Sequence, residues 1–204
     1  MKSESNNNSA TKISLTVKPD RMSLFSSLLG QGFTLKILTG ISVRDLLCRQ
    51  IGVRDDYLDQ RIQTIFLDGK VVDNVDTAVI RQGSTLALSA AMPGLAGATL
   101  RRGSAYAAMR NQITHQKGTC GESTKDGTIC LKLFNLVAAD IGQLFLEKGI
   151  LISGKYFGDL FRSAPDKIIS GVRSGEVDGV RMSTDQIVSM DWEQTQVFLK
   201  LEAV

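Results

Sequence analysis

The fold of this chain is decided by residues 62–72, which read IQTIFLDGKVV. Successive side chains of residues 62–67 alternate between two faces, which is typical of a strand. Asp68-Gly69 follows, and this dipeptide favours the positive φ angles of a two-residue hairpin turn. Residues 70–72, Lys-Val-Val, then return to strand-forming side chains. The stretch therefore predicts two antiparallel strands joined by a tight turn.

Further strands are predicted on both sides of this hairpin. Downstream, residues 82–84 (Gln-Gly-Ser) form a turn signal, and residues 85–89 alternate in the same way as a final strand. Upstream, residues 33–38 and residues 13–18 each place three apolar side chains on one face. We therefore expect a sheet of four or five strands, beginning with the strand at 13–18.

One helix is predicted at residues 42–51, between the second and third strands. Ser42 and Asp45 have the spacing of a capping box, with Asp in the place of the usual Glu. Apolar residues at positions 43, 46, 47 and 51 share one face, and Gly52 ends the helix. Two strands, one helix and two or three strands predict an α+β module in which a sheet wraps around one helix.

Four segments, in this order and at this spacing, resemble the β-grasp sulfur-carrier proteins, which include the molybdopterin-synthase small subunit and the thiamine sulfur carrier. The segments are SVRDLL (42–47), IFLDGKVV (65–72), Asp76-Thr77 and RQGSTLAL (81–88). The resemblance covers residues 13–98 and implies a ubiquitin-like β-grasp fold for them. It also implies sulfur transfer through a C-terminal Gly-Gly that becomes a thiocarboxylate.

The sequence departs from that family where its reactive tail would emerge. Residues 91–98 read AMPGLAGA, so Gly94 and Gly97 are tail-like, but more than a hundred residues follow them. The carrier chemistry needs a free terminal carboxylate. It would therefore require processing after Gly94 or Gly97, or a divergent use of this apolar segment as a loop. A simple interdomain linker is the structural alternative.

The second half of the chain predicts another small α+β module at residues 128–204. Residues 129–145 fit a helical face, or a strand to residue 134 followed by a helix that Asn135 begins. A short strand at 150–152, helices near 156–161 and from Pro165, and a closing strand at 196–202 complete it. Residues 99–127 are expected to be a basic connector, and residues 1–12 a polar, disordered leader.

Charge is distributed unevenly along the sequence. The net charge is +3, which is too mild to favour nucleic-acid binding. Residues 77–121, however, contain five basic residues and no Asp or Glu. Arg101, Arg102, Arg110 and Lys117 lie in this stretch and are the candidate contacts to an acidic protein surface or an anionic ligand. The alternative is a solvated basic face.

Catalytic and metal motifs are absent from the sequence. His115 is the only histidine and lies in a polar segment, so no catalytic triad is suggested. Cys120 and Cys130 have no second Cys or His pair that would complete a zinc site. Cys48 lies next to Leu47 in the predicted helix and is interpreted as a small buried apolar residue. The sequence predicts no metal site and no cofactor.

Neither a signal peptide nor a membrane helix is predicted. Residues 1–12 lack an apolar run, and the apolar stretch 131–152 contains four charged residues. We therefore expect a cytoplasmic protein with no membrane contact. The favoured hypothesis is a non-enzymatic β-grasp adaptor that docks an acidic partner. The alternatives are a sulfur-carrier-like protein and an enzyme that binds a small anion between the two modules. The sequence leaves the oligomeric state open.

Overall fold

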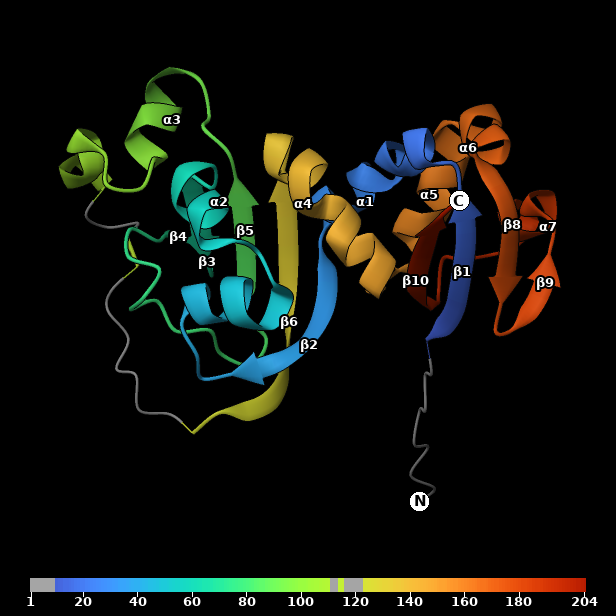
Figure 1. Ribbon diagram of the computed structural model, residues 1–204, viewed down its shortest axis with the longest axis horizontal. Helices are drawn as coiled ribbons and strands as arrows, with labels where there is room; N and C mark the ends of the chain where they lie inside the picture. The colour runs from blue at the N-terminus through green and yellow to red at the C-terminus, as the bar shows by residue number, and fades with distance from the viewer. Residues whose placement is uncertain (1–9, 111–113, 116–122) are drawn as a thin grey trace. The chain divides into compact units, whose positions relative to one another are not determined.

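The computed structural model describes residues 10–110, 114–115 and 123–204, and these form a mixed α+β fold (Figure 1). The α+β class predicted from the sequence is confirmed. The chain divides into two compact units. The central unit is Thr34–Gly142, and the terminal unit combines the described part of Met1–Phe33 with Gln143–Val204.

Five strands lie side by side in the central unit, in both parallel and antiparallel pairs. Their order is β4-β3-β5-β6-β2. β3 is antiparallel to β4 and β5, and β5 is parallel to β6. Thr39, at the end of β2, donates a hydrogen bond to the carbonyl of Lys125, at the start of β6, as in antiparallel neighbours. The strands are β2 (Phe33–Thr39), β3 (Thr64–Leu67), β4 (Lys70–Val71), β5 (Thr85–Ser89) and β6 (Lys125–Phe134).

Two short helices follow β2 in the central unit. Helix η2 (Asp45–Ile51) is wound as a π-helix, and α2 (Asp55–Gln60) comes directly after it. The Ser42 hydroxyl accepts a hydrogen bond from the Asp45 N–H, so the predicted start of this helix is confirmed. Gly52 ends it in the left-handed region at φ 92°. Apolar side chains of both helices and of the strands are buried together: Leu46, Leu47, Leu58, Ile65, Leu67, Leu86 and Leu88.

The strands of the terminal unit follow the order β7-β10-β1-β8-β9. β1 and β10 are parallel, and the other neighbouring pairs are antiparallel. The strands are β1 (Thr11–Val17), β7 (Ile150–Ser153), β8 (Val172–Val177), β9 (Val180–Met182) and β10 (Gln196–Ala203). The helices are η1 (Pro19–Phe25), α1 (Ser26–Gln31), α5 (Gly154–Ser163), α6 (Pro165–Gly171) and α7 (Thr184–Ser189).

The partners of the first strand differ from the sequence expectation. The strand at 13–18 was expected to form one module with residues 33–89, but β1 belongs to the terminal unit. β1 lies between β8 and β10, with Leu15 opposite Gly175 on one side and Leu201 on the other. The alternation of apolar residues predicted the strand and its buried face, but it contains no information on which distant strand will pair with it.

The second half follows the predicted elements closely. Of the two alternatives for residues 129–145, the strand that precedes a helix is confirmed, because β6 ends at Phe134 and α4 (Asn135–Lys148) begins at Asn135. The strands at 150–152 and 196–202 and the helix at Pro165 are confirmed as β7, β10 and α6. The leader prediction lies largely outside the described residues, but Thr11 and Lys12 already belong to β1.

No helix within the described ranges is long and apolar enough to span a bilayer.

Candidate functional site

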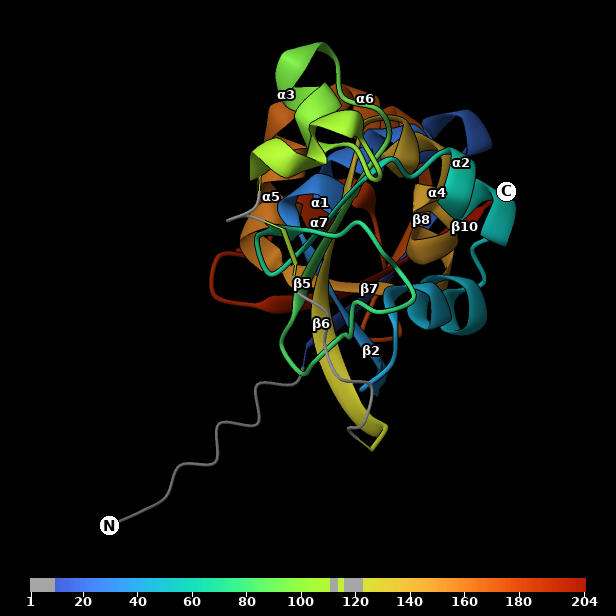
Figure 2. The ribbon, with the colours of Figure 1, turned by 90° about the vertical axis from the view of Figure 1, so that its left-hand side faces the viewer.

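The candidate site is the helical segment that follows β5, residues 91–110, which we name the lobe. It contains α3 (Gly94–Leu100) and the 3₁₀-helix η3 (Ala105–Arg110), which pack against each other. In two perpendicular views α3 stands beyond the end of β5 (Figures 1 and 2). The lobe includes both of the tail-like glycines and three of the four basic residues that the sequence singles out.

Arg110 anchors the lobe to the body of the central unit. Its side chain is only 1% exposed and forms a two-pronged pair with the Asp73 carboxylate, at 2.9 Å from Nη1 and 2.6 Å from Nη2. The guanidinium also donates to the carbonyls of Thr99, at 2.7 Å, and Arg101, at 3.2 Å, near the C-terminal end of α3. Every guanidinium nitrogen of Arg110 therefore has a partner within the central unit.

A second set of bonds holds the connection between α3 and η3. The backbone N–H of Arg102 donates to the carbonyl of Gln63, before β3, and Gly103 donates to Asp73. The Arg102 side chain is 15% exposed and lies 3.5 Å from Asp59 of α2. The lobe is thus tied both to the start of β3 and to α2.

Asp59 belongs to a wider ionic cluster around Arg44. The Arg44 guanidinium lies 3.0 Å from Asp55, 2.9 Å from Asp59 and 2.6 Å from Asp76. Hydrogen bonds from Arg44 hold the pKa of Asp59 below its usual range. These carboxylates are half exposed, so we attribute to them the positioning of α2 rather than a large stabilisation.

The Asp73 carboxylate is less exposed than the three carboxylates that surround Arg44. Burial acts to raise the pKa of Asp73, but hydrogen bonds from Arg110 and from the Gly103 N–H outweigh it, so the pKa lies below its ordinary value. The carboxylate is therefore ionised at neutral pH, where it pairs with Arg110.

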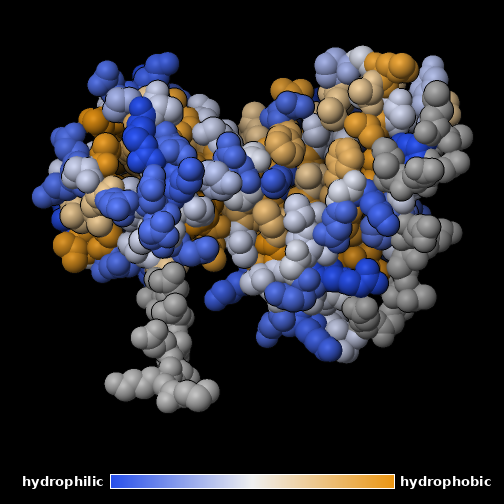
Figure 3. Space-filling view, turned by 180° about the vertical axis from the view of Figure 1, so that it is seen from behind, coloured by the Kyte–Doolittle hydropathy of each residue, from blue (hydrophilic) through white to orange (hydrophobic). Residues whose placement is uncertain are grey.

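Two large apolar side chains are exposed among the described residues of the lobe. Leu95 is 71% exposed and Tyr106 is 48% exposed. Of the seven residues of α3, all of which the structure describes, only Gly97 is buried. A Cβ at position 97 would overlap the carbonyl of Met92, so this glycine permits the chain to fold back on itself. In the space-filling view from behind, hydrophobic residues lie exposed over this region at the upper right (Figure 3).

The structure separates the basic residues that the sequence groups together. Arg101 is exposed at the end of α3, whereas Arg102 and Arg110 are paired with Asp59 and Asp73. Lys117 lies outside the described residues. Gly94 and Gly97 are both in α3, a helix rather than an extended tail.

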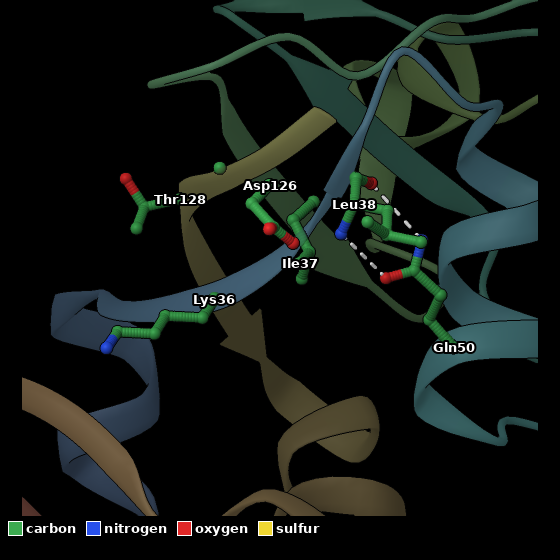
Figure 4. A pocket seen from close by; sticks show the side chains of 7 residues that line it. Lys36, Ile37, Leu38, Gln50, Asp126 and Thr128 are labelled. Atoms are coloured by element: carbon green, nitrogen blue, oxygen red, sulfur yellow. Dashed lines mark hydrogen bonds between the residues drawn. The ribbon is translucent and has the colours of Figure 1, made fainter. Parts of the chain in front are cut away.

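A surface pocket of about 600 Å³ lies elsewhere on the central unit, between the end of β2 and the start of β6 (Figure 4). The Gln50 carboxamide accepts a hydrogen bond from the Leu38 N–H, at 3.0 Å, and donates to the Leu38 carbonyl, at 3.2 Å. Gln50 therefore covers backbone groups of β2 in the way that a neighbouring strand would. The lining residues are Lys36, Ile37, Leu38, Gln50, Asp126, Gly127 and Thr128.

The thiol of Cys48 and the hydroxyl of Tyr57 are held in their protonated, less nucleophilic forms. Burial and a hydrogen bond with Asp55 raise the pKa of the Cys48 thiol to about 11, so very little thiolate exists at neutral pH. Burial and a hydrogen bond to Asp140 likewise raise the pKa of Tyr57. Cys120 lies outside the described residues. Among those described, no three His, Cys, Asp or Glu side chains converge as a metal site.

A scan against models of protein families, a search of curated proteins and a search of solved structures find no match to this chain.

Proposed function

We propose that this protein is a non-enzymatic adaptor whose lobe binds a partner protein with an acidic surface. One observation carries the proposal: an anchored helical segment exposes the apolar side chains of Leu95 and Tyr106, and it also exposes the cation of Arg101. Exposed large apolar side chains that lie together, with polar residues around them, mark interaction surfaces in soluble proteins.

Charge indicates the kind of partner. The lobe contains no Asp or Glu, and the acid-free stretch extends from residue 77 to residue 121. Arg101 can bind a partner carboxylate, while Arg102 and Arg110 are already used to hold the lobe in place. A charge at the rim of an interface mainly selects the partner and speeds the encounter. Full burial of Leu95, the more exposed of the two side chains, would contribute at most about 1.5–3 kcal/mol.

The fold that presents the lobe is proposed to be a β-grasp module with its strands in a permuted order. This is supported by the Asp68-Gly69 hairpin of β3 and β4, by the helix between β2 and β3, and by the sheet that packs on that helix. In this arrangement β6, and not the strand at residues 13–18, is the parallel neighbour of β5. The lobe is then an insertion between the two parallel strands of the module.

Site-specific photo-crosslinking tests the proposed function. A photoreactive amino acid at position 95 of the full chain is expected to form a covalent adduct with another protein in native cells. The matched control is position 180, because Val180 is 64% exposed and also apolar, but lies on β9. Equal adduct formation from both positions, or none from position 95, would show that the lobe is not a binding surface.

A further inference from the structure

The two units arrange their strands alike. In the central unit the hairpin of β3 and β4 lies next to β5, which is parallel to β6. In the terminal unit the hairpin of β8 and β9 lies next to β1, which is parallel to β10. The hairpin turns are also alike, because Asp68-Gly69 has φ angles of 51° and 77° and Asp178-Gly179 has 50° and 82°. β1 therefore takes the place in the terminal unit that β5 takes in the central unit.

The two units obtain this strand from different parts of the chain. β3, β4 and β5 follow one another within residues 64–89, so the central unit takes its strand from the same stretch as the hairpin. β1 comes from residues 11–17, whereas its neighbours β8 and β10 lie within residues 172–203, beyond the whole central unit in the sequence. Residues 143–204 thus provide the strands on both sides of β1 but not β1 itself.

Residues 143–204 bind β1 along both of its edges, as Figure 1 shows. β1 pairs with β10 over its whole length and with β8 from residue 13 to residue 17. The Asp178 carboxylate also accepts a hydrogen bond from the Lys12 N–H at 2.8 Å, and the Asp178 N–H donates to the Lys12 carbonyl. Three apolar side chains of β1 are buried, namely Ile13, Leu15 and Val17. This is recognition of a strand by main-chain pairing and by alternate side chains.

The helices that follow β1 belong to the same piece of chain. η1 and α1 pack on α5, α6 and β10, all of which come from residues 143–204. Their buried apolar side chains are Met22, Phe25, Leu28 and Leu29. We name residues 10–31 the donor segment and residues 143–204 the acceptor. The donor segment is held in the terminal unit by the acceptor, through strand pairing on β1 and through apolar packing on η1 and α1.

A single residue connects the donor segment to β2. α1 ends at Gln31 and β2 begins at Phe33, so only Gly32 lies between them. Gly32 has φ 108° and ψ 135°. Glycine adopts positive and negative φ angles about equally well, so a change of φ at this residue can turn the donor segment away from its own acceptor. Short connections of this kind favour the exchange of a segment between copies of a protein.

We propose that two copies of this chain bind each other by exchanging the donor segment, so that β1, η1 and α1 of each copy occupy the acceptor of the other. The occupant is a second copy because its donor segment makes the same hydrogen bonds and the same buried contacts as the chain's own. The covalent connection gives the chain's own segment the higher effective concentration, so the closed chain prevails in dilute solution. The exchanged pair forms at high protein concentration. This inference is independent of the function proposed for the lobe.

Engineered cysteines test the exchange. Ser14 of β1 and Glu176 of β8 lie directly opposite each other, and both side chains are accessible to solvent. Opposite residues of antiparallel strands are close enough for a disulfide bond. Full chains with Ser14→Cys are mixed with full chains with Glu176→Cys, partly unfolded in urea, refolded at high protein concentration and treated with oxidised glutathione. We expect a disulfide between position 14 of one chain and position 176 of the other, identified by mass spectrometry of the linked peptides.

A chain that carries both substitutions is the positive control, because it can form the same bond within one closed chain. Formation of that bond shows that the two positions are correctly placed for a disulfide. If the bond forms in this control but no bond joins position 14 to position 176 between chains in the mixture, the inference is overturned.

Gly32→Ala tests the connection itself. Alanine is strained at φ 108° in the closed chain, and an exchanged pair relieves this strain at two connections. We therefore expect the dimer dissociation constant, measured by sedimentation, to fall about 25-fold, which is about fivefold for each connection. Gly52→Ala is the matched control, because Gly52 has φ 92° and an added Cβ would meet no atom within 4 Å, but it ends η2 in the central unit. Equal dissociation constants for the two variants would also overturn the inference.

Discussion

Replacement of Arg110 by alanine is expected to free the lobe and destabilise the central unit by about 3 kcal/mol. The substitution leaves the Asp73 carboxylate without its cation and the carbonyls of Thr99 and Arg101 without a donor. Loss of one partner from a buried ion pair costs about 3–5 kcal/mol, and the lower end applies because Asp73 is 32% exposed. Urea unfolding measures the loss, and amide exchange at Gly103, which donates to Asp73, reports the release of the lobe.

Arg49→Ala is the matched control, because Arg49 is 80% exposed and pairs with Asp45 one helical turn away. Its expected cost is about 0.3–0.5 kcal/mol. Protonation of Asp73 by acid should destabilise the central unit of the native chain, as Arg110→Ala does. The folded pKa of Asp73 lies below the unfolded value of about 3.9, so the stabilisation is present at neutral pH and is lost as the pH falls through the lower folded pKa. A cost for Arg110→Ala no greater than that for Arg49→Ala would contradict the anchoring role.

Leu15→Ala is expected to destabilise the terminal unit by about 2–5 kcal/mol, the usual range for a fully buried leucine. Leu15 is 1% exposed in the middle of β1, and its strand separates β8 from β10. Native-state hydrogen exchange should therefore show lost protection in β8 and β10. The amides of β3 and β5, which pair within the central unit, should keep their protection at low denaturant.

The control for this substitution is Leu95→Ala, which removes the same atoms from a side chain that is 71% exposed and should change stability by less than about 0.5 kcal/mol. If Leu15→Ala instead exposed β3 and β5 to exchange, β1 would belong with the strands of residues 33–89, as the sequence alone suggested.

Local structure could be predicted from the sequence because the signals are local. The Asp68-Gly69 turn, the Ser42–Asp45 helix start and the strand before Asn135 all depend on residues within a few positions of one another. β1 pairs with strands that contain Glu176 and Lys200, and both residues lie far from β1 in the chain. The alternation of apolar residues in β1 does not indicate which distant strands will be its neighbours. The duplicated hairpin at Asp178-Gly179 is visible in the sequence, and its likeness to Asp68-Gly69 was the available signal for a second similar unit.

The sequence indicated the segment that contains the candidate site, but it did not indicate the role of each residue in that segment. The acid-free stretch drew attention to Arg101, Arg102 and Arg110, but the sequence could not indicate which arginine is buried. Arg110 is neutralised by Asp73, 37 positions away, and such long-range ion pairs leave no trace in a local pattern. Leu95 and Tyr106 were missed because an apolar residue in a helix is ordinarily expected to face a core.

The most direct test of the lobe as a protein-binding surface is the native size of the chain in extracts of its own cells, measured by gel filtration. We compare the unmodified chain with Leu95→Ser/Tyr106→Ser and with the control Val180→Ser. The account predicts that the unmodified chain and the control elute with a partner and that the double variant elutes at the size of the chain alone. Elution of the double variant together with the unmodified chain would contradict it.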